Sequence, residues 1–152
     1  LGAAEIDMHG NVNVSKFAGK VTGPGGFINI TQGAKTVCFL GTFTAGKSEI
    51  NVKDGGIDIV REGKYIKFKK NVEHITFSGE YSIEKGNQNV FYITERAVFK
   101  LTGKGLTLIE VAPGIDIEKD ILPFMEFTPV ISDDLRTMDR RLFLPEKMGL
   151  EI

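Results

Sequence analysis

Three glycines in four positions, at residues 23–26, are the feature that most constrains how this chain folds. Such a run makes poor strand and poor helix, because glycine loses more backbone freedom on folding than any other residue. It suits a tight turn or a close approach of the backbone to another group. The apolar residues that follow are spaced as one stripe of a short helix: Phe27, Ile28, Ile30 and Ala34. The sequence therefore predicts a glycine turn that leads into a helix.

The chemistry of such a turn comes from its backbone. The first N–H groups of a helix have no partner inside the helix, and they lie at the positive end of the aligned peptide dipoles. This place suits an anion, a phosphate or the oxyanion of an acyl-transfer intermediate. A single glycine cluster is a weak signal, so a plain turn with a helix behind it and no ligand stays open as the alternative.

The composition excludes several classes of protein. With 152 residues, 41% of them hydrophobic and 26% charged, the chain is long and apolar enough for one domain with a core. A net charge of −1 gives no argument for nucleic acid or an anionic membrane as partner. No apolar run approaches a membrane span, and no signal peptide is recognisable. The first residue is Leu1 and the opening reads like mid-domain sequence, so we expect a fragment or processed piece, with one domain over residues 1–152.

The single cysteine bears on the compartment. Cys38 forms no disulfide within the chain and no cysteine zinc cluster, so a reducing compartment, the cytoplasm, is expected. It lies in the apolar run at residues 37–40 and is interpreted as a small buried hydrophobic residue.

Apolar patterning predicts an α/β fold, with a mixed β-sheet, flanking helices and a β-rich insertion. The unbroken apolar run at residues 36–40 is typical of an interior strand buried on both faces. Alternating segments at residues 48–70, separated by turns at 53–56 and 62–63, predict a three-stranded antiparallel meander at the edge of the domain. Its basic run is interpreted as a solvated strand face or a protected edge: Lys64, Lys67, Lys69 and Lys70.

The remaining elements follow from alternation and from caps. Strands are predicted at residues 1–8, 11–15, 72–77, 89–94, 97–101 and 106–111, the last two as a hairpin. A short helix is predicted from Ser78 to a closing Gly86, and another behind the cap residue Asp116. Residues 128–131 are expected to be extended, and the tail from Asp133 to be peripheral.

Residues 41–48 match the phosphate-loop pattern G-x-x-x-x-G-K-[ST] and follow an apolar strand. A nucleotide-binding loop must open into a helix, whose first N–H groups join it in holding the phosphates. Ser48 is instead followed by period-two alternation that ends in a hairpin turn. No later apolar strand ends in an aspartate that would hold magnesium. We therefore reject a nucleoside-triphosphate site.

The titratable residues form no recognisable catalytic pattern. His9 and His74 are isolated, and a structural role is expected for both. Four glutamates are possible acids, but none lies in a context that demands chemistry: Glu5, Glu80, Glu95 and Glu110.

Several blocks together resemble the C-terminal part of the family I coenzyme A transferases. In chain order they are LGAAEID (1–7), GNVNVSKF (10–17), GPGGFINI (23–30), ITERAVF (93–99) and GLTLIEVAPGI (105–115). Each block is weak alone, but their order and spacing follow the family over nearly the whole chain. The insertion around residues 48–70 and the stretch 77–81 are more similar to the acetate/propionate, short-chain acyl branch than to the succinyl-CoA:3-oxoacid branch.

The resemblance implies a ping-pong enzyme. In the family, a glutamate carboxylate attacks the acyl-CoA thioester, and coenzyme A is then held as a glutamyl thioester until a second acid takes it. That nucleophile sits in a Glu-x-Gly motif upstream of the block at residues 10–17, which this chain lacks together with the N-terminal domain. Glu5 lies in a different context and is not assigned the role. The chain alone is therefore expected to be inactive.

By position, the resemblance assigns the oxyanion donors to the backbone of Gly26, with Gly25 beside it. It places Gly23, Phe27 and Asn29 at the substrate, the last two against the pantetheine arm. Coenzyme A is then a substrate, and neither a permanently bound cofactor nor a metal is expected.

The implied partners are the acyl-CoA and carboxylic acid substrates and the missing N-terminal part of the same enzyme, with a homo-oligomer at full length. Neither nucleic acid nor membrane is expected. The alternative is a non-catalytic binding module that keeps an anion or coenzyme A site at the glycine turn.

Overall fold

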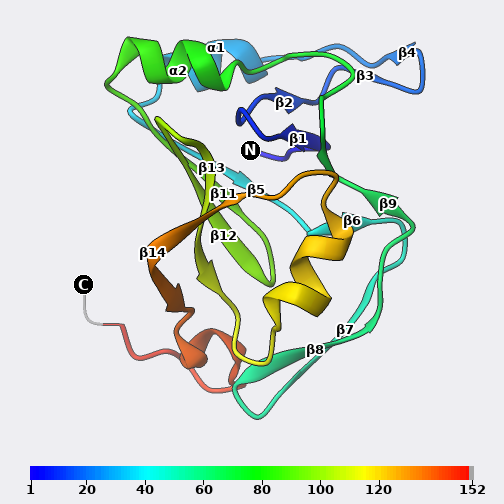
Figure 1. Cartoon of the computed structure of the whole chain (residues 1–152), viewed down its shortest axis with the longest axis vertical. Helices are drawn as coiled ribbons and strands as arrows, with labels where there is room; N and C mark the ends of the chain where they lie inside the picture. Colours follow the sequence, from blue (N-terminus) through cyan, green and yellow to red (C-terminus); the bar gives the residue numbers. More distant parts are fainter. Residues whose placement is uncertain (151–152) are drawn as a thin grey trace.

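A five-stranded mixed sheet organises the computed structural model, which describes residues 1–150 (Figure 1). Its strand order is β14-β13-β12-β11-β5, with antiparallel pairing of β11, β12 and β13 and parallel pairing at both outer strands. The strands are β5 (Thr36–Leu40), β11 (Asn89–Ile93), β12 (Ala97–Thr102), β13 (Gly105–Val111) and β14 (Val130–Thr137). The mixed sheet predicted from the sequence is confirmed, as is the hairpin of β12 and β13.

A second, smaller sheet has the order β10-β1-β2, with β1 (Glu5–Asp7), β2 (Val12–Asn13) and β10 (Phe68–Lys69). Three two-stranded pairs complete the β-structure of residues 1–150. They are β3 (Lys16–Phe17) with β4 (Lys20–Val21), β6 (Thr44–Ala45) with β9 (Tyr65–Ile66), and β7 (Glu49–Lys53) with β8 (Gly56–Arg61).

The helices are short. α1 (Phe27–Gly33) and α2 (Gly79–Lys85) lie together at the top of Figure 1, where Lys85 Nζ donates to the carbonyl of Gln32 at 3.1 Å. Single turns follow later, as a π-helix (Ile117–Ile121) and 3-10 helices (Leu122–Phe124 and Arg140–Phe143). Among residues 1–150, no helix has the length and apolar character needed to cross a bilayer.

The predicted closing residue Gly86 and the predicted cap residue Asp116 are confirmed. The Ser78 side chain accepts from the N–H of Tyr81, and Gly86 ends α2 with a φ of 72°, a left-handed conformation that glycine adopts without strain. The Asp116 side chain likewise accepts from the N–H of Lys119. The helix behind the glycine turn forms as the apolar spacing predicted.

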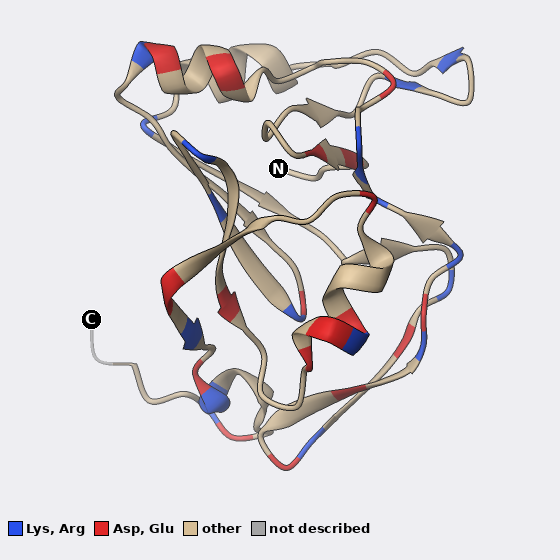
Figure 2. Cartoon of the chain, in the orientation of Figure 1, with Lys and Arg blue, Asp and Glu red and all other residues tan. Residues whose placement is uncertain are grey.

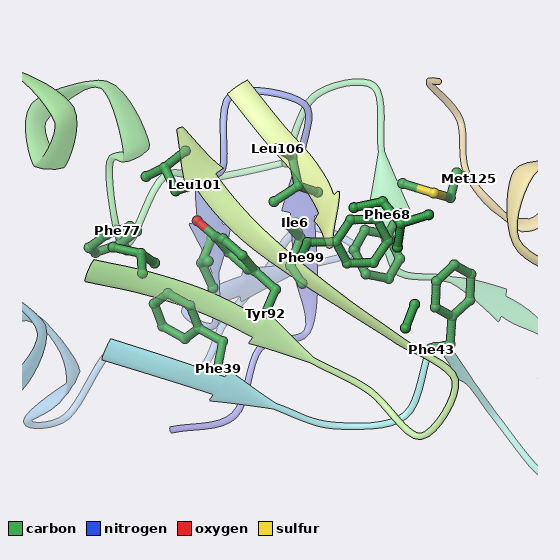
Figure 3. Packing of buried hydrophobic residues seen from close by; sticks show 14 of the residues in the cluster. Ile6, Phe39, Phe43, Phe68, Phe77, Tyr92, Phe99, Leu101, Leu106 and Met125 are labelled. Atoms are coloured by element: carbon green, nitrogen blue, oxygen red, sulfur yellow. The ribbon is translucent and has the colours of Figure 1, made fainter. Parts of the chain in front are cut away.

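One face of the large sheet packs into an aromatic core (Figure 3). Phe39 is buried in it, and its ring centroid lies 5.7 Å from that of Phe27, 5.2 Å from that of Phe77 and 5.3 Å from that of Tyr92. Edge-to-face and offset contacts of this kind add to the burial of apolar area. Through Phe27, the core holds the start of α1, and with it the end of the glycine turn.

Strand β5 differs from its prediction. It is an edge strand of the sheet among the described residues, and only Val37 and Phe39 are buried, whereas Thr36 and Leu40 are exposed and Cys38 is partly exposed. An apolar run shows that a strand can be buried on both faces, but the neighbouring elements decide how many faces are covered. The interpretation of Cys38 as fully buried is wrong for the same reason.

The insertion at residues 48–70 is not a three-stranded meander. The β7–β8 hairpin forms as predicted at the lower edge of Figure 1, but the third segment leaves it. β9 pairs with β6 and β10 runs parallel to β1, because Phe68 is fully buried in the main core. The predicted strand at 72–77 is absent from the described chain except for a single bridge, and the tail from Asp133 is not peripheral, since β14 extends to Thr137.

Candidate functional site

The glycine turn, residues 23–26, has a defined geometry. Gly25 has a φ of 55°, and Gly26 has a φ of −82° and a ψ of 2°. The N–H of Phe27 donates to the carbonyl of Pro24 at 3.0 Å. These φ angles and this hydrogen bond match a type II′ turn, which needs a positive φ at its first central residue. Gly23 also has a positive φ, of 80°.

The turn presents backbone donors that nothing in the described chain accepts. The N–H groups of Gly25 and Gly26 have no hydrogen-bond partner among residues 1–150, and both residues are exposed. No side chain caps α1, and its first turn holds no acidic residue. Residues 22–34 carry no charged side chain at all, as the uncoloured ribbon between β4 and α1 shows in Figure 2. These donors are therefore free to meet an oxygen from outside the chain.

The other residues expected at the site divide into two groups. Gly23 and Asn29 are exposed next to the free donors. The side chain of Phe27, in contrast, is only 6% exposed and stacks on Phe39, so any contact it makes with a ligand comes from its backbone. A Cβ built on Gly26 meets only Ile30 Cδ1, at 3.7 Å, so the space outside this residue is open.

A buried ion cluster that the sequence analysis did not predict surrounds Arg96. We call it the arginine cluster, and its other members are Phe43, Thr44, Glu62 and Glu95. The guanidinium is fully buried and donates in bidentate fashion to Glu62, and to Glu95 Oε1 at 2.8 Å. It also donates to the carbonyl of Asp120 at 3.0 Å. Adjacent glutamate and arginine at 95–96 were the only signal, and such pairs are common on surfaces.

The carboxylates of the arginine cluster are also satisfied. Glu95 accepts from the N–H of Phe43 at 2.8 Å, and Glu62 accepts from the hydroxyl of Thr44 at 2.8 Å. The guanidinium carbon lies 4.9 Å from the centre of the Phe43 ring, a cation–π contact. With charges paired and hydrogen-bonded throughout, this cluster has the features of a structural element rather than a reactive one.

Lys67 corrects the interpretation of the basic run as a solvated face. It is 8% exposed, and its ammonium donates to the carbonyl of Thr42 at 2.9 Å. Burial lowers the pKa of Lys67, and the nearby charge of Glu95 opposes that effect. Lys69 instead pairs with Glu126 at 2.8 Å, and this hydrogen bond is the main reason why the pKa of Glu126 is lowered.

Among residues 1–150, the remaining titratable groups form no second site. His9 Nδ1 lies 4.0 Å from an exposed Glu80, and Glu110 pairs with Arg136 at 3.0 Å. Across the described chain, no group of three His, Cys, Asp or Glu side chains is arranged to hold a metal ion. Ser48 leads into strand β7 and not into a helix, which confirms the rejection of the phosphate loop.

The curated relatives that the chain matches are coenzyme A transferases. No protein-family model matches the chain. The acetate CoA-transferase YdiF of Escherichia coli K12 is 53% identical over 149 residues, which are 98% of this chain and 28% of that protein. The caffeate CoA-transferase of Acetobacterium woodii is 51% identical over 156 residues, covering 99% of this chain and 29% of that protein. The chain thus spans less than a third of the length of the curated relatives it matches.

The chain is also similar to solved structures of coenzyme A transferases. The acyl-CoA transferase YdiF from Escherichia coli O157:H7, as apoenzyme, has a TM-score of 0.96 and 52% identity, covering 99% of this chain and 29% of that one. The glutaconate coenzyme A-transferase of Acidaminococcus fermentans, with a TM-score of 0.64 and 17% identity, covers 92% of this chain and 52% of its own, and it shares the fold.

Proposed function

This chain belongs to family I of the coenzyme A transferases, of which it matches the C-terminal part, and from this premise we propose that its glycine turn forms the oxyanion side of a coenzyme A transfer site. The observation that carries the proposal is the pair of exposed, unpartnered N–H groups on Gly25 and Gly26. The full reaction belongs to a longer protein, since the relatives are more than three times as long.

The proposed reaction is a two-stage exchange. A glutamate carboxylate from outside this chain attacks the carbonyl carbon of an acyl-CoA, the carbon–sulfur bond breaks, and the coenzyme A thiolate leaves behind an acyl-glutamyl anhydride. The thiolate then attacks the glutamyl carbonyl and expels the acyl group as a free carboxylate. The resulting glutamyl-CoA thioester gives its coenzyme A to a second acid by the reverse steps. A structure of the Escherichia coli O157:H7 enzyme is a thioester complex with coenzyme A, which supports the middle step.

The glycine turn acts where negative charge develops. Each attack turns a carbonyl oxygen into an oxyanion, and two N–H groups that have no other partner stabilise it without rearranging first. Gly26 is the first donor and Gly25 the second. Gly23 and Asn29 lie beside them on the exposed stretch that we propose contacts the pantetheine arm, together with the backbone of Phe27.

The substrate proposal is coarser than the site proposal. The two relatives at 53% and 51% identity act on acetate and caffeate respectively, so overall similarity does not separate a short acid from an aromatic one. We propose a short-chain acid such as acetate or propionate, because the insertion at residues 48–70 resembles that of the acetate/propionate branch of the family. The cytoplasmic location and the homo-oligomer stay predictions.

The decisive experiment replaces Gly26 by valine in the full-length enzyme. The φ of −82° is open to any residue and the new Cβ meets only the end of Ile30, so the fold should persist. The branched side chain occupies the open space that the acyl group must enter. We expect turnover to fall by about 10²–10³, the typical effect of losing one oxyanion donor. The measurement is the rate of acyl exchange, with thermal melting as the check on folding.

Gly103→Ala is the matched control, because a Cβ there meets nothing within 4 Å and the residue lies in a remote turn. It should keep wild-type turnover. Near-normal turnover in Gly26→Val would make the glycine turn structural and remove the site assignment. Retained binding of coenzyme A by a full-length protein that shows no exchange with any acid would favour the binding-module alternative. The 152-residue chain alone should show no transfer.

A further inference from the structure

The glycine turn directly follows the β3–β4 hairpin, which has little packing of its own. β3 and β4 have two residues each, and Val21 is 77% exposed. After β4, the N–H groups of Thr22 and Gly23 donate to the carbonyl of Ser15 at 2.9 and 3.3 Å, and the Thr22 hydroxyl donates to the carbonyl of Val14 at 3.2 Å. A two-stranded hairpin of this size is marginal by itself. Contacts from outside the hairpin therefore decide where the glycine turn lies.

One such contact is made by Glu73 at the tip of the hairpin. Ala18 and Gly19 both have positive φ, of 48° and 75°. Both N–H groups donate to the carboxylate of Glu73, to Oε2 at 2.8 Å and to Oε1 at 3.0 Å. Each oxygen takes one donor, and Lys16 Nζ lies 3.9 Å from Oε1. A carboxylate that accepts two backbone N–H groups holds a tip more firmly than a neutral acceptor does.

A second contact holds the base of the hairpin. The hydroxyl of Thr76 accepts from the N–H of Val14 at 3.1 Å and shares a hydrogen bond of 2.6 Å with the hydroxyl of Ser15. Ser15 is 5% exposed, and its carbonyl is the acceptor for both Thr22 and Gly23. Thr76 is therefore two hydrogen bonds away from the first glycine of the turn.

The segment that carries Glu73 and Thr76 is itself fixed to the small sheet. The N–H of Glu73 donates to Glu5 Oε2 at 2.9 Å, and that oxygen also accepts from Asn13 Nδ2 at 2.7 Å. The N–H of Thr76 donates to the carbonyl of Val12 at 2.8 Å. A continuous path of hydrogen bonds thus runs from the core-packed strands β1 and β2 to the hairpin.

We propose that Glu73 and Thr76 are positioning residues that hold the glycine turn where its free N–H groups meet the reacting carbonyl. Neither touches the turn directly. Glu73 binds the tip of the hairpin and Thr76 binds its base. Together they hold the hairpin in one orientation, and so fix the direction in which residues 22–26 extend from it. This role rests on the proposed function of the turn. The hydrogen bonds that Glu73 and Thr76 form with the hairpin, here called the tether, can be tested without measuring activity.

The test uses Glu73→Gln and Thr76→Val in the full-length enzyme. The glutamine amide keeps the size of Glu73 but offers one acceptor oxygen for two N–H groups, and valine removes only the hydroxyl of Thr76. For each variant we expect kcat to fall about three- to tenfold, the effect of one hydrogen bond, with KM unchanged. Amide hydrogen exchange in the peptide at residues 22–27 should become faster. Thr76→Ser should restore both properties.

Glu118→Gln and Thr128→Val are controls on exposed side chains away from the hairpin and should match the wild type in both measurements. Wild-type kcat or unchanged exchange at residues 22–27 in both tether variants would overturn the proposal. If Thr76→Val does not fold, Glu73→Gln decides alone, because that side chain is 32% exposed. If Gly26→Val keeps its turnover, the proposed function fails and the exchange rates still test the tether. If Gly26→Val is inactive and both tether variants are fully active, only the positioning role fails.

Discussion

Four hydrogen bonds hold the guanidinium of Arg96 inside the protein, whereas Gly25 and Gly26 present N–H groups that no atom of the described chain accepts. The arginine cluster is paired throughout and its central side chain is fully buried, while the glycine turn is exposed and uncharged. Both stretches belong to blocks that resemble the transferase family.

The difference separates a polar element that stabilises the fold from one that we propose binds a ligand. Buried polar groups must be paired within the protein, because an unpaired one costs the free energy of its lost hydration. An exposed donor costs nothing in the free protein, since water occupies it, and it gains a stronger partner when an oxyanion forms in a site closed to water. Complete pairing therefore indicates a structural role for Arg96, whereas the unpartnered N–H groups of Gly25 and Gly26 are the basis of the proposed oxyanion site.

The largest expected effect is at the arginine cluster. Arg96→Met removes the cation and leaves two partly buried carboxylates without it, so the free energy of unfolding should fall by about 3–5 kcal/mol. Urea unfolding of the chain is the measurement. Arg61→Met is the matched control, because its ion pair with Glu49 is exposed and should contribute less than about 1 kcal/mol. Equal losses in both variants would show that burial does not distinguish the cluster.

A smaller effect is expected from backbone geometry in the glycine turn. Gly25→Ala places a side chain at a φ of 55° and should cost about 1–2 kcal/mol of stability, although the new Cβ has no atom within 4 Å. Gly26→Ala, at a φ of −82°, should be neutral or stabilise by up to about 1 kcal/mol. Thermal melting compares the two. A larger loss of stability in Gly26→Ala than in Gly25→Ala would mean that Gly26, and not Gly25, is the position that requires glycine.

The smallest effect is a pH dependence at Lys67. Burial lowers its pKa in the folded protein, so the unfolded chain binds more protons at pH values between that pKa and the ordinary value of 10.5. The stability of the wild type should therefore rise with pH in this range, relative to Lys67→Met.

Urea unfolding of both proteins at a series of pH values below 10 measures this difference. Burial also raises the pKa of Tyr92 well above 10.0, so the ionisation of this residue lowers the stability of the protein only at pH values above 10. Both proteins contain Tyr92, so its effect cancels in the comparison. A constant difference between the two proteins would mean that the Lys67 ammonium is hydrated in the fold.

Local signals in the sequence were sufficient for several elements. The spacing of apolar residues after the glycines predicted α1, Ser78 and Gly86 predicted the limits of α2, and alternation after Ser48 excluded a phosphate loop. In each case the deciding interactions lie within a few residues of one another. The same locality made the glycine turn recognisable as a candidate site from the sequence alone.

Other features depended on residues far apart in the chain. The sequence showed that β5 is apolar, but the order of strands decided that only one of its faces is buried. Lys67 looked like part of a solvated run until the packing of Phe68 turned it toward Thr42, 25 residues away.

By itself, then, the sequence determined the α/β class, the helices α1 and α2 and the glycine turn, because these follow from the backbone preferences of neighbouring residues. Only the tertiary structure decided that Phe27 belongs to the core, that Gly25 and not Gly26 needs the left-handed backbone, and that Glu73 reaches the hairpin tip across 54 and 55 residues. Such contacts depend on how distant segments pack, and no local pattern of residues records that packing.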